Sequence, residues 1–189
     1  MKNNTNWSKT LLGIYRYLPR VTYAYDNLVK SRAYNSSATN SFLLGFNDIM
    51  KVANTIINLT ERKNNLINLK VLTDKVLCDI DLSSAKILVM KFIDGKKSNE
   101  IANLLHLGKR TYFRKLNFAL ESFANMLTRL NYTDYKLENM IKDEKWILRL
   151  YNSYSNRKIN QTENIMDNFY FRSKFQRNLM YEIKKVGVC

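Results

Sequence analysis

Only five glycines and one proline occur among the 189 residues, and this scarcity constrains the fold more than any other feature. Sheets joined by many tight turns place glycine and proline at those turns, so a sandwich or barrel would need more of both. Hydrophobic residues make up 46% of the chain, which is enough to bury a sizeable core and argues against wholesale disorder. The expected fold is therefore all-α, a helical bundle of roughly six to eight helices with short connections and little or no sheet.

The N-terminal region, residues 1–80, shows helical periodicity on both sides of a polar segment. The pattern over Trp7–Lys30 predicts a helix that is interrupted or restarted at Pro19, because proline lacks a backbone donor and clashes with the preceding turn. The segment Arg32–Ser41 is small and polar, so we expect a connection there, with Ser41 as the N-cap of the next helix.

Beyond this connection, apolar residues at three-to-four spacing predict two further helices. The first covers Phe42–Ile57 and the second covers Leu66–Ile80, and the segment 58–65 predicts a turn that joins them in an antiparallel hairpin. Long amphipathic helices of this kind serve either packing or dimerisation, and the sequence leaves both open.

The middle region, residues 81–130, predicts three helices in close succession. Either Ser83 or Ser84 can cap the first helix with its hydroxyl group. Gly95 can end this helix, because glycine readily adopts the left-handed conformation that helix ends often require.

The second and third helices of this region predict a helix-turn-helix. Ser98 can cap a helix that ends near His106, and Gly108 then allows a tight turn into a third helix over Lys109–Leu127. Ala102 is small, as the second helix requires where it approaches the third. The central helix-turn-helix is therefore part of the expected fold.

The third helix has two contrasting faces. Its apolar stripe, which we expect on the core side, comprises Tyr112, Leu116, Ala119, Leu120, Phe123 and Leu127. The opposite face carries Arg110, Arg114 and Asn117 near the N-terminus, with Thr111 and Phe118 beside them. Arginine and asparagine pair bidentately with guanine and adenine, and recognition helices read bases mainly with their N-terminal residues. The predicted phosphate contacts are Lys96, Lys97, Ser98, Lys109 and Lys115.

The segment "LSSAKILVMKFIDGKKSNEIANLLHLGKRTYFRKLNFAL" resembles region 4 of bacterial sigma-70-type factors, and most of all the version in phage transcriptional regulators of the ArpU and RinA type. The resemblance implies a helix-turn-helix whose last helix reads promoter DNA; in sigma factors proper, region 4 also docks on RNA polymerase. The DNA-facing positions that it implies are Arg110, Thr111, Arg114, Lys115 and Asn117. Tyr112 stands where a small aliphatic residue is usual, and residues 1–80 lack the acidic and aromatic signature of a sigma region 2.

The charge balance indicates a polyanionic partner. The chain has 31 Lys and Arg against 16 Asp and Glu, a net charge of +15. Nucleic acid is the first candidate and an anionic membrane surface the second, while a composition biased toward Lys and Asn is the structural alternative. Because one reader helix contacts only about four to six base pairs, further contacts are needed. Basic residues spread over all three regions could supply a long phosphate footprint, or a homodimer could bind half-sites about one helical turn apart, and we expect the dimer.

The C-terminal region, residues 131–189, predicts helices around 135–154 and 163–185 and carries a surplus of basic residues. The second of these helices has a stripe of Phe171, Phe175, Leu179 and Ile183, which together with the helices at Phe42–Ile80 offers a dimerisation surface. An aromatic stripe at helical spacing is more often core than a base-stacking platform.

No residue pattern indicates catalysis. Cys78, expected to be buried, and Cys189 are too few for a disulfide framework or zinc site, and His106 is the single histidine. Asp143 and Glu144 are adjacent acids, and we expect them to be solvated. We therefore predict no enzyme activity, no metal and no cofactor. Without a signal peptide or an apolar run of about 18 residues, the expected protein is soluble and cytoplasmic.

Three functional hypotheses follow from these patterns. The leading one is a sequence-specific, double-stranded DNA-binding transcription regulator of bacterial or phage origin. The alternative is a sigma-like interaction module that docks on RNA polymerase or on a sigma factor. An RNA-binding protein is the third hypothesis, and it depends only on charge and aromatic content.

Overall fold

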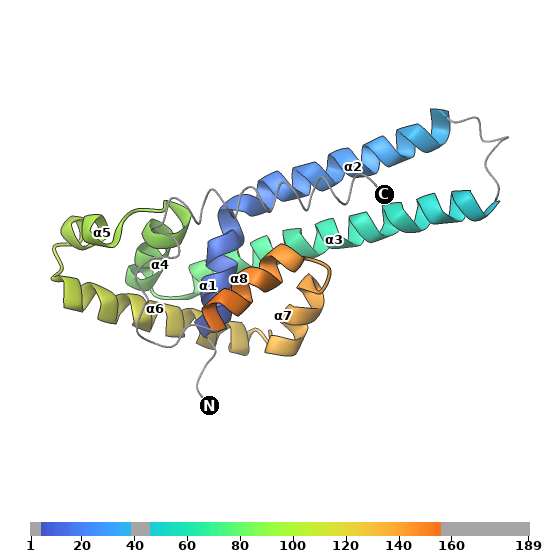
Figure 1. Cartoon of the computed structure of the whole chain (residues 1–189). Helices are drawn as coiled ribbons and strands as arrows, with labels where there is room; N and C mark the ends of the chain where they lie inside the picture. Colours follow the sequence, from blue (N-terminus) through green and yellow to red (C-terminus); the bar gives the residue numbers. More distant parts are fainter. Residues whose placement is uncertain (1–4, 39–45, 156–189) are drawn as a thin grey trace.

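The computed structural model describes residues 5–38 and 46–155, and in these ranges the chain is helical without any strand (Figure 1). The prediction of an all-α fold is confirmed. In chain order the elements are α1 (Thr5–Ile14), the 3-10 turn η1 (Tyr15–Tyr17), α2 (Leu18–Ala38), α3 (Phe46–Asp79), α4 (Leu82–Leu88), the π-helical turn η2 (Val89–Ile93), α5 (Ser98–Leu104), α6 (Lys109–Arg129), α7 (Asp134–Ile141) and α8 (Lys145–Ser155).

The helix break near Pro19 is confirmed, and the connection after it is wrong. The 3-10 turn η1 separates α1 from α2, and Pro19 lies in the first turn of α2, where its missing N–H costs no helical hydrogen bond. The predicted connection at Arg32–Ser41 is helical as far as Ala38, and residues 39–41, with the predicted cap Ser41, lie outside the described residues. Small polar residues lower helix propensity but do not end a helix as glycine or proline does.

A single helix, α3, replaces the two helices predicted between Phe42 and Ile80. Its 34 residues run through the segment 58–65, which contains neither glycine nor proline. Leu59 and Leu66 are seven residues apart and both are buried, so the core-facing stripe continues across the predicted turn. The antiparallel hairpin is instead formed by α2 and α3, which pack along each other and extend away from the other helices; we call this hairpin the arm (Figure 1).

The core joins segments that are far apart in the sequence. Helix α1 packs against both α6 and α8, and Trp7 stacks on Tyr151 with ring centroids 4.3 Å apart. The hydroxyl of Ser8, fully buried in α1, donates to the backbone carbonyl of Leu120 in α6 at 3.1 Å. One cluster of buried residues continues from Trp7 to Leu150, so the three regions distinguished by sequence share a core within the described residues.

Several smaller expectations have clear outcomes. Cys78 is exposed near the end of α3, so the prediction of a buried thiol is wrong: the buried stripe of α3 passes through Val76 on the other side of the helix. The range 135–154 holds two helices, α7 and α8, rather than one. The predicted helix at 163–185, with its stripe of Phe171, Phe175, Leu179 and Ile183, lies outside the described residues, as does Cys189. None of the described helices combines the length and the apolar character needed to cross a membrane.

Candidate nucleic-acid interface

Asp81 is the N-cap of helix α4, a role that the sequence analysis assigned to Ser83 or Ser84. The Oδ2 atom of Asp81 accepts from the backbone N–H of Ser84 at 2.9 Å and from the hydroxyl of Ser83 at 2.6 Å. These hydrogen bonds, that from Ser83 first, lower the pKa of Asp81. The serine prediction failed because a carboxylate two or three residues upstream is an equally good acceptor for the first-turn N–H.

Between α4 and α5 the chain widens into a π-helical turn and then reverses. The turn η2 ends at Ile93, and Gly95 has a φ of 70°, so the predicted left-handed glycine is confirmed. The backbone N–H of Lys96 donates to the carbonyl of Met90 at 2.9 Å and closes the reversal. This turn places Lys96 and Lys97 directly before α5.

Ser98 is the first residue of α5 and does not cap it. The N-cap residue is Lys97, and the hydroxyl of Ser98 instead accepts from the ammonium group of Lys91 at 3.1 Å. Lys97 is exposed and Lys96 is half-buried. Three of the five predicted phosphate-contact residues, Lys96, Lys97 and Ser98, thus lie together at the N-terminus of α5, and Ser98 is hydrogen-bonded to a third lysine, Lys91.

The turn between α5 and α6 depends on His106 rather than on Gly108. Helix α5 ends at Leu104, two residues earlier than predicted, and His106 adopts a left-handed φ of 52°. The N–H of His106 donates to Asn103 O at 3.1 Å, and the N–H of Leu107 donates to Ala102 O at 2.9 Å, which is a Schellman motif. Gly108 is the N-cap of α6 with φ −64° and ψ 147°, a conformation open to any residue, so its predicted role in the turn is wrong.

The inward face of α6 is as predicted. Helix α5 packs on α6 with Ile101 and Ala102 buried, in agreement with the expected close approach at a small residue. All of the predicted core stripe of α6 is buried, namely Tyr112, Leu116, Ala119, Leu120, Phe123 and Leu127. This face anchors α6 to the body of the protein and fixes which side chains point outward.

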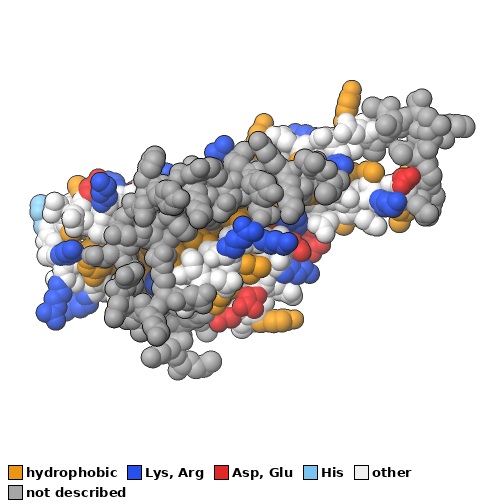
Figure 2. All heavy atoms as spheres, in the orientation of Figure 1, with side chains coloured by type: hydrophobic (Ala, Val, Ile, Leu, Met, Phe, Trp, Pro, Cys, Tyr) orange, Lys and Arg blue, Asp and Glu red, His pale blue; other side chains and the backbone are white. Residues whose placement is uncertain are grey.

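The outward face of α6 carries the predicted DNA-facing residues. Lys109, Arg110, Arg114, Lys115 and Asn117 are all exposed, and Thr111 is half-buried. Within the ranges 5–38 and 46–155, the side chains of Arg110, Arg114 and Lys115 form no ion pair with a carboxylate. Figure 2 shows Lys and Arg side chains at the end of the molecule where Figure 1 draws α5 and the start of α6.

The electrostatics of this end favour an anion. The N-terminus of a helix carries about half a positive charge, and α6 adds Lys109 and Arg110 in its first turn, with no acidic residue there. Like charges so placed raise the free energy of the folded state by a few tenths of a kcal/mol unless an anion offsets them. We call this surface, formed by Lys96, Lys97 and Ser98 with the outward residues of α6 from Lys109 to Asn117, the basic face.

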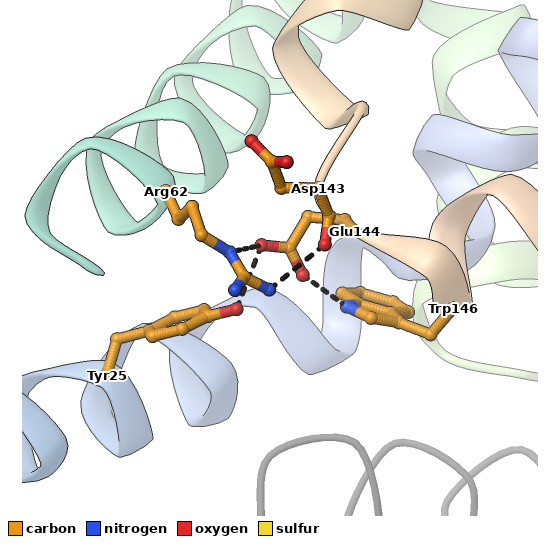
Figure 3. A network of polar contacts seen from close by, with 5 residues as sticks. All are labelled: Tyr25, Arg62, Asp143, Glu144 and Trp146. Carbon is orange, nitrogen blue, oxygen red and sulfur yellow. Dashed lines mark hydrogen bonds and ion pairs between the residues drawn. The ribbon is translucent and has the colours of Figure 1, made fainter. Parts of the chain in front are cut away.

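A second polar cluster, far from the basic face in sequence, was missed by the sequence analysis (Figure 3). Glu144, expected to be solvated, is only 2% exposed in the turn between α7 and α8. Its carboxylate accepts from the phenol of Tyr25 at 2.9 Å, Arg62 Nε at 2.9 Å and Trp146 Nε1 at 2.8 Å. The guanidinium of Arg62 also donates to Asp143 O at 3.1 Å, while the side chain of Asp143 is exposed as predicted.

This cluster joins the arm to the turn between α7 and α8. Burial lowers the pKa of Arg62, but the hydrogen bond and charge of Glu144 outweigh burial and raise it overall. The sequence offered one signal for this cluster, the position of Arg62. It lies between the buried Leu59 and Leu66 on the core-facing stripe of α3, where a charged side chain requires a partner of opposite charge. All four hydrogen bonds are internal, so we assign the cluster to stability rather than to ligand binding.

No group of three or more His, Cys, Asp or Glu side chains in the described ranges could hold a metal ion. Comparisons of the chain with models of protein families, with curated proteins and with solved structures found no match. The basic face is thus the candidate site, and its interpretation depends on its own chemistry and on the resemblance in sequence.

Proposed function

We propose that this protein is a sequence-specific, double-stranded DNA-binding transcription regulator of bacterial or phage origin that acts in the cytoplasm. In this proposal the first two turns of α6 enter the major groove. Arg110, Arg114 and Asn117 contact base edges, with Thr111 beside them. Phosphates are held by Lys96, Lys97, Ser98, Lys109 and Lys115.

One observation carries the proposal: Arg110 and Arg114, which pair with no carboxylate of the described residues, project from a helix whose opposite stripe is buried. A solvated basic helix needs no such anchoring, whereas base readout requires side chains held at a fixed orientation relative to the body of the protein. The sequence resemblance to sigma region 4 supports the same assignment. The proposal includes no catalytic step, metal or cofactor.

A docking role on RNA polymerase or on a sigma factor is the second candidate, favoured by a different observation. Phe118 is 61% exposed on α6 and Leu104 is 50% exposed on α5. Exposed apolar side chains beside a basic face fit a protein partner better than they fit a phosphate backbone. Phe118 directly follows Asn117 on α6, so the docking surface would adjoin the residues proposed to contact bases.

Selection of bound duplexes from a random pool, followed by affinity measurements on the selected site, tests the first candidate. We expect Arg114→Ala to cost roughly 1 to 3 kcal/mol and to relax the base preference at the positions it reads. Lys97→Ala should weaken all duplexes alike and reduce the slope of log affinity against log salt by about 1. Lys75→Ala, exposed on the arm, is the matched control and should change neither quantity.

Two results would remove the assignment to DNA. One is an Arg114→Ala variant that binds the selected duplex as tightly as the parent. The other is competition by single-stranded RNA at equal salt as effective as competition by duplex DNA, which would favour the RNA-binding hypothesis. Capture of polymerase that survives Arg110→Ala and Arg114→Ala but is lost with Phe118→Ala would support the docking role.

A further inference from the structure

Helix α3 has two apolar sides, of which only one faces the rest of the chain. The inner stripe packs in the arm and in the core, and its residues alternate at spacings of three and four. They are Leu59, Arg62, Leu66, Leu69, Thr73 and Val76. Each is buried except Arg62, which pairs with Glu144. This stripe accounts for the packing of α3 within one chain.

The opposite side of α3 carries a second stripe with the same alternating spacing. We call it the outer stripe, and it comprises Met50, Ala53, Ile57, Thr60, Asn64, Ile67 and Val71. At about 100° per residue it lies roughly 180° around the helix from the inner stripe. Ile57 is 63% exposed, Val71 59%, Met50 44% and Ile67 39%.

This pattern is typical of a helix that pairs with another helix. Single exposed apolar residues are common, but here five apolar residues flank the polar Thr60 and Asn64 in one stripe with three-to-four spacing, which extends over about 21 residues or about 32 Å. The spacing also matches that of the inner stripe, so both sides of α3 present the geometry used for helix–helix packing. Among the described residues, α2 and the other helices cover the inner seam, and the large apolar residues of the outer stripe are exposed.

The order of residues in the outer stripe is self-complementary when a second copy runs antiparallel. With a twofold axis at the level of residue 62, each outer-stripe residue from Ala53 to Val71 meets a residue of its own kind, apolar or polar, and Met50 at the end of the stripe faces Asp74. The opposed pairs are Ala53 with Val71, Ile57 with Ile67, and Thr60 with Asn64 of the second copy. The hydroxyl and the amide at the central layers can hydrogen-bond across the axis and disfavour other registers.

Other arrangements of the same two helices are less favourable. A one-heptad shift of the antiparallel pair opposes Asn64 to Ile67 and Ile57 to Asp74. A parallel pair brings Asp74 close to its own copy, a repulsion that the ion pair of each Asp74 with Lys70 reduces but does not remove. The antiparallel register brings Glu61 near its own copy, but Glu61 is exposed, so salt screens this repulsion.

We propose that two copies of this chain associate through the outer stripes of α3 in this antiparallel register. The dimer requires no DNA. In this dimer the positions of the two α3 helices set the distance between the two basic faces. This inference about DNA spacing, unlike the dimer itself, rests on the proposed function. The C-terminal ends of the two α3 helices lie about 51 Å apart, which is longer than one helical turn of DNA, about 34 to 36 Å. In this dimer we therefore expect half-sites more than one helical turn apart, a wider spacing than the sequence analysis expected.

Sedimentation equilibrium of the full chain without DNA tests the dimer. We expect dimerisation in the micromolar range, and Ile57→Lys should weaken it at least about tenfold because a charge would be buried in the seam. Ile57 is exposed in one copy, so the helical circular dichroism of the variant should match the parent. Tyr23→Lys, exposed on α2, is the matched control and should dimerise as the parent does.

Disulfide trapping tests the register, in a background with Cys78→Ser and Cys189→Ser. The double variant Ile57→Cys, Ile67→Cys should form crosslinked dimers under mild oxidation, and neither single variant should. Crosslinking by each single variant would indicate a parallel pair and overturn the register. A parent chain that stays monomeric at tens of micromolar, or an Ile57→Lys variant that dimerises normally, would overturn the dimer itself. Arg114→Ala should leave dimerisation intact, so failure of the DNA proposal remains distinguishable.

Discussion

Arg62 and Glu144, 82 residues apart in the sequence, form a buried ion pair with Nε and Oε1 2.9 Å apart. The pair connects the middle of α3 to the turn between α7 and α8, and Tyr25 adds a hydrogen bond from α2 (Figure 3). Three elements of the arm and body therefore meet at one carboxylate. Because the carboxylate is almost fully buried, its partners determine whether its presence stabilises the fold.

Removal of Glu144 alone should be strongly destabilising. Glu144→Leu leaves the guanidinium of Arg62, the phenol of Tyr25 and the indole N–H of Trp146 without their acceptor, and we expect a loss of about 3 to 5 kcal/mol in the free energy of unfolding. The double variant Arg62→Met, Glu144→Leu should lose clearly less than the sum of the two single variants. Urea unfolding followed by circular dichroism measures the free energy of unfolding of the parent, the two single variants and the double variant, which together form a double-mutant cycle. Strict additivity would show that the pair is not coupled.

Tyr25 should make stability depend on alkaline pH. Burial and the charge of Glu144 raise the pKa of the Tyr25 phenol well above its ordinary value. A phenol in the unfolded chain ionises above about pH 10 while the folded one stays protonated, so the stabilisation is complete below pH 10 and is lost as the pH rises further. Tyr25→Phe should lower the free energy of unfolding by about 1 to 2 kcal/mol at neutral pH, and the difference between parent and variant should become smaller above about pH 10.

The matched control for this measurement is Tyr23→Phe, two residues away on α2 and exposed. Urea unfolding of both variants and the parent from neutral to alkaline pH separates the effect of Tyr25 from the general loss of lysine charge. If the difference in the free energy of unfolding between the parent and Tyr25→Phe stays constant up to the highest pH, the buried phenol–carboxylate contact is contradicted.

The turn between α5 and α6 should respond to substitution at His106 and not at Gly108. His106 has a φ of 52°, which glycine adopts without strain, so His106→Gly should raise the free energy of unfolding by about 0.5 to 1 kcal/mol. Gly108→Ser should be neutral or stabilising: a Cβ there meets nothing within 4 Å, and serine is a better N-cap. Thermal unfolding measures both. A large decrease in the free energy of unfolding for Gly108→Ser would show that the turn requires glycine at position 108.

The sequence was most informative where structure depends on neighbours within one helix. The two faces of α6 follow from its own periodicity, so the buried stripe from Tyr112 to Leu127 and the exposed Arg110 and Arg114 could both be predicted. The break near Pro19 and the left-handed Gly95 are likewise local, because each follows from the covalent geometry of one residue. The use of these exposed residues to read DNA stays a prediction.

Tertiary contacts decided the rest. Glu144 is buried and Arg62 is half-buried because each satisfies the other, and no local pattern shows that two such residues meet. The segment 58–65 looks like a connection by itself, yet it is helical because Leu59, Arg62 and Leu66 continue a stripe that α2 and the turn before α8 cover. Burial is a property of contacts between distant segments, so periodicity within a helix identifies its apolar sides, and only the packed structure shows which side is covered.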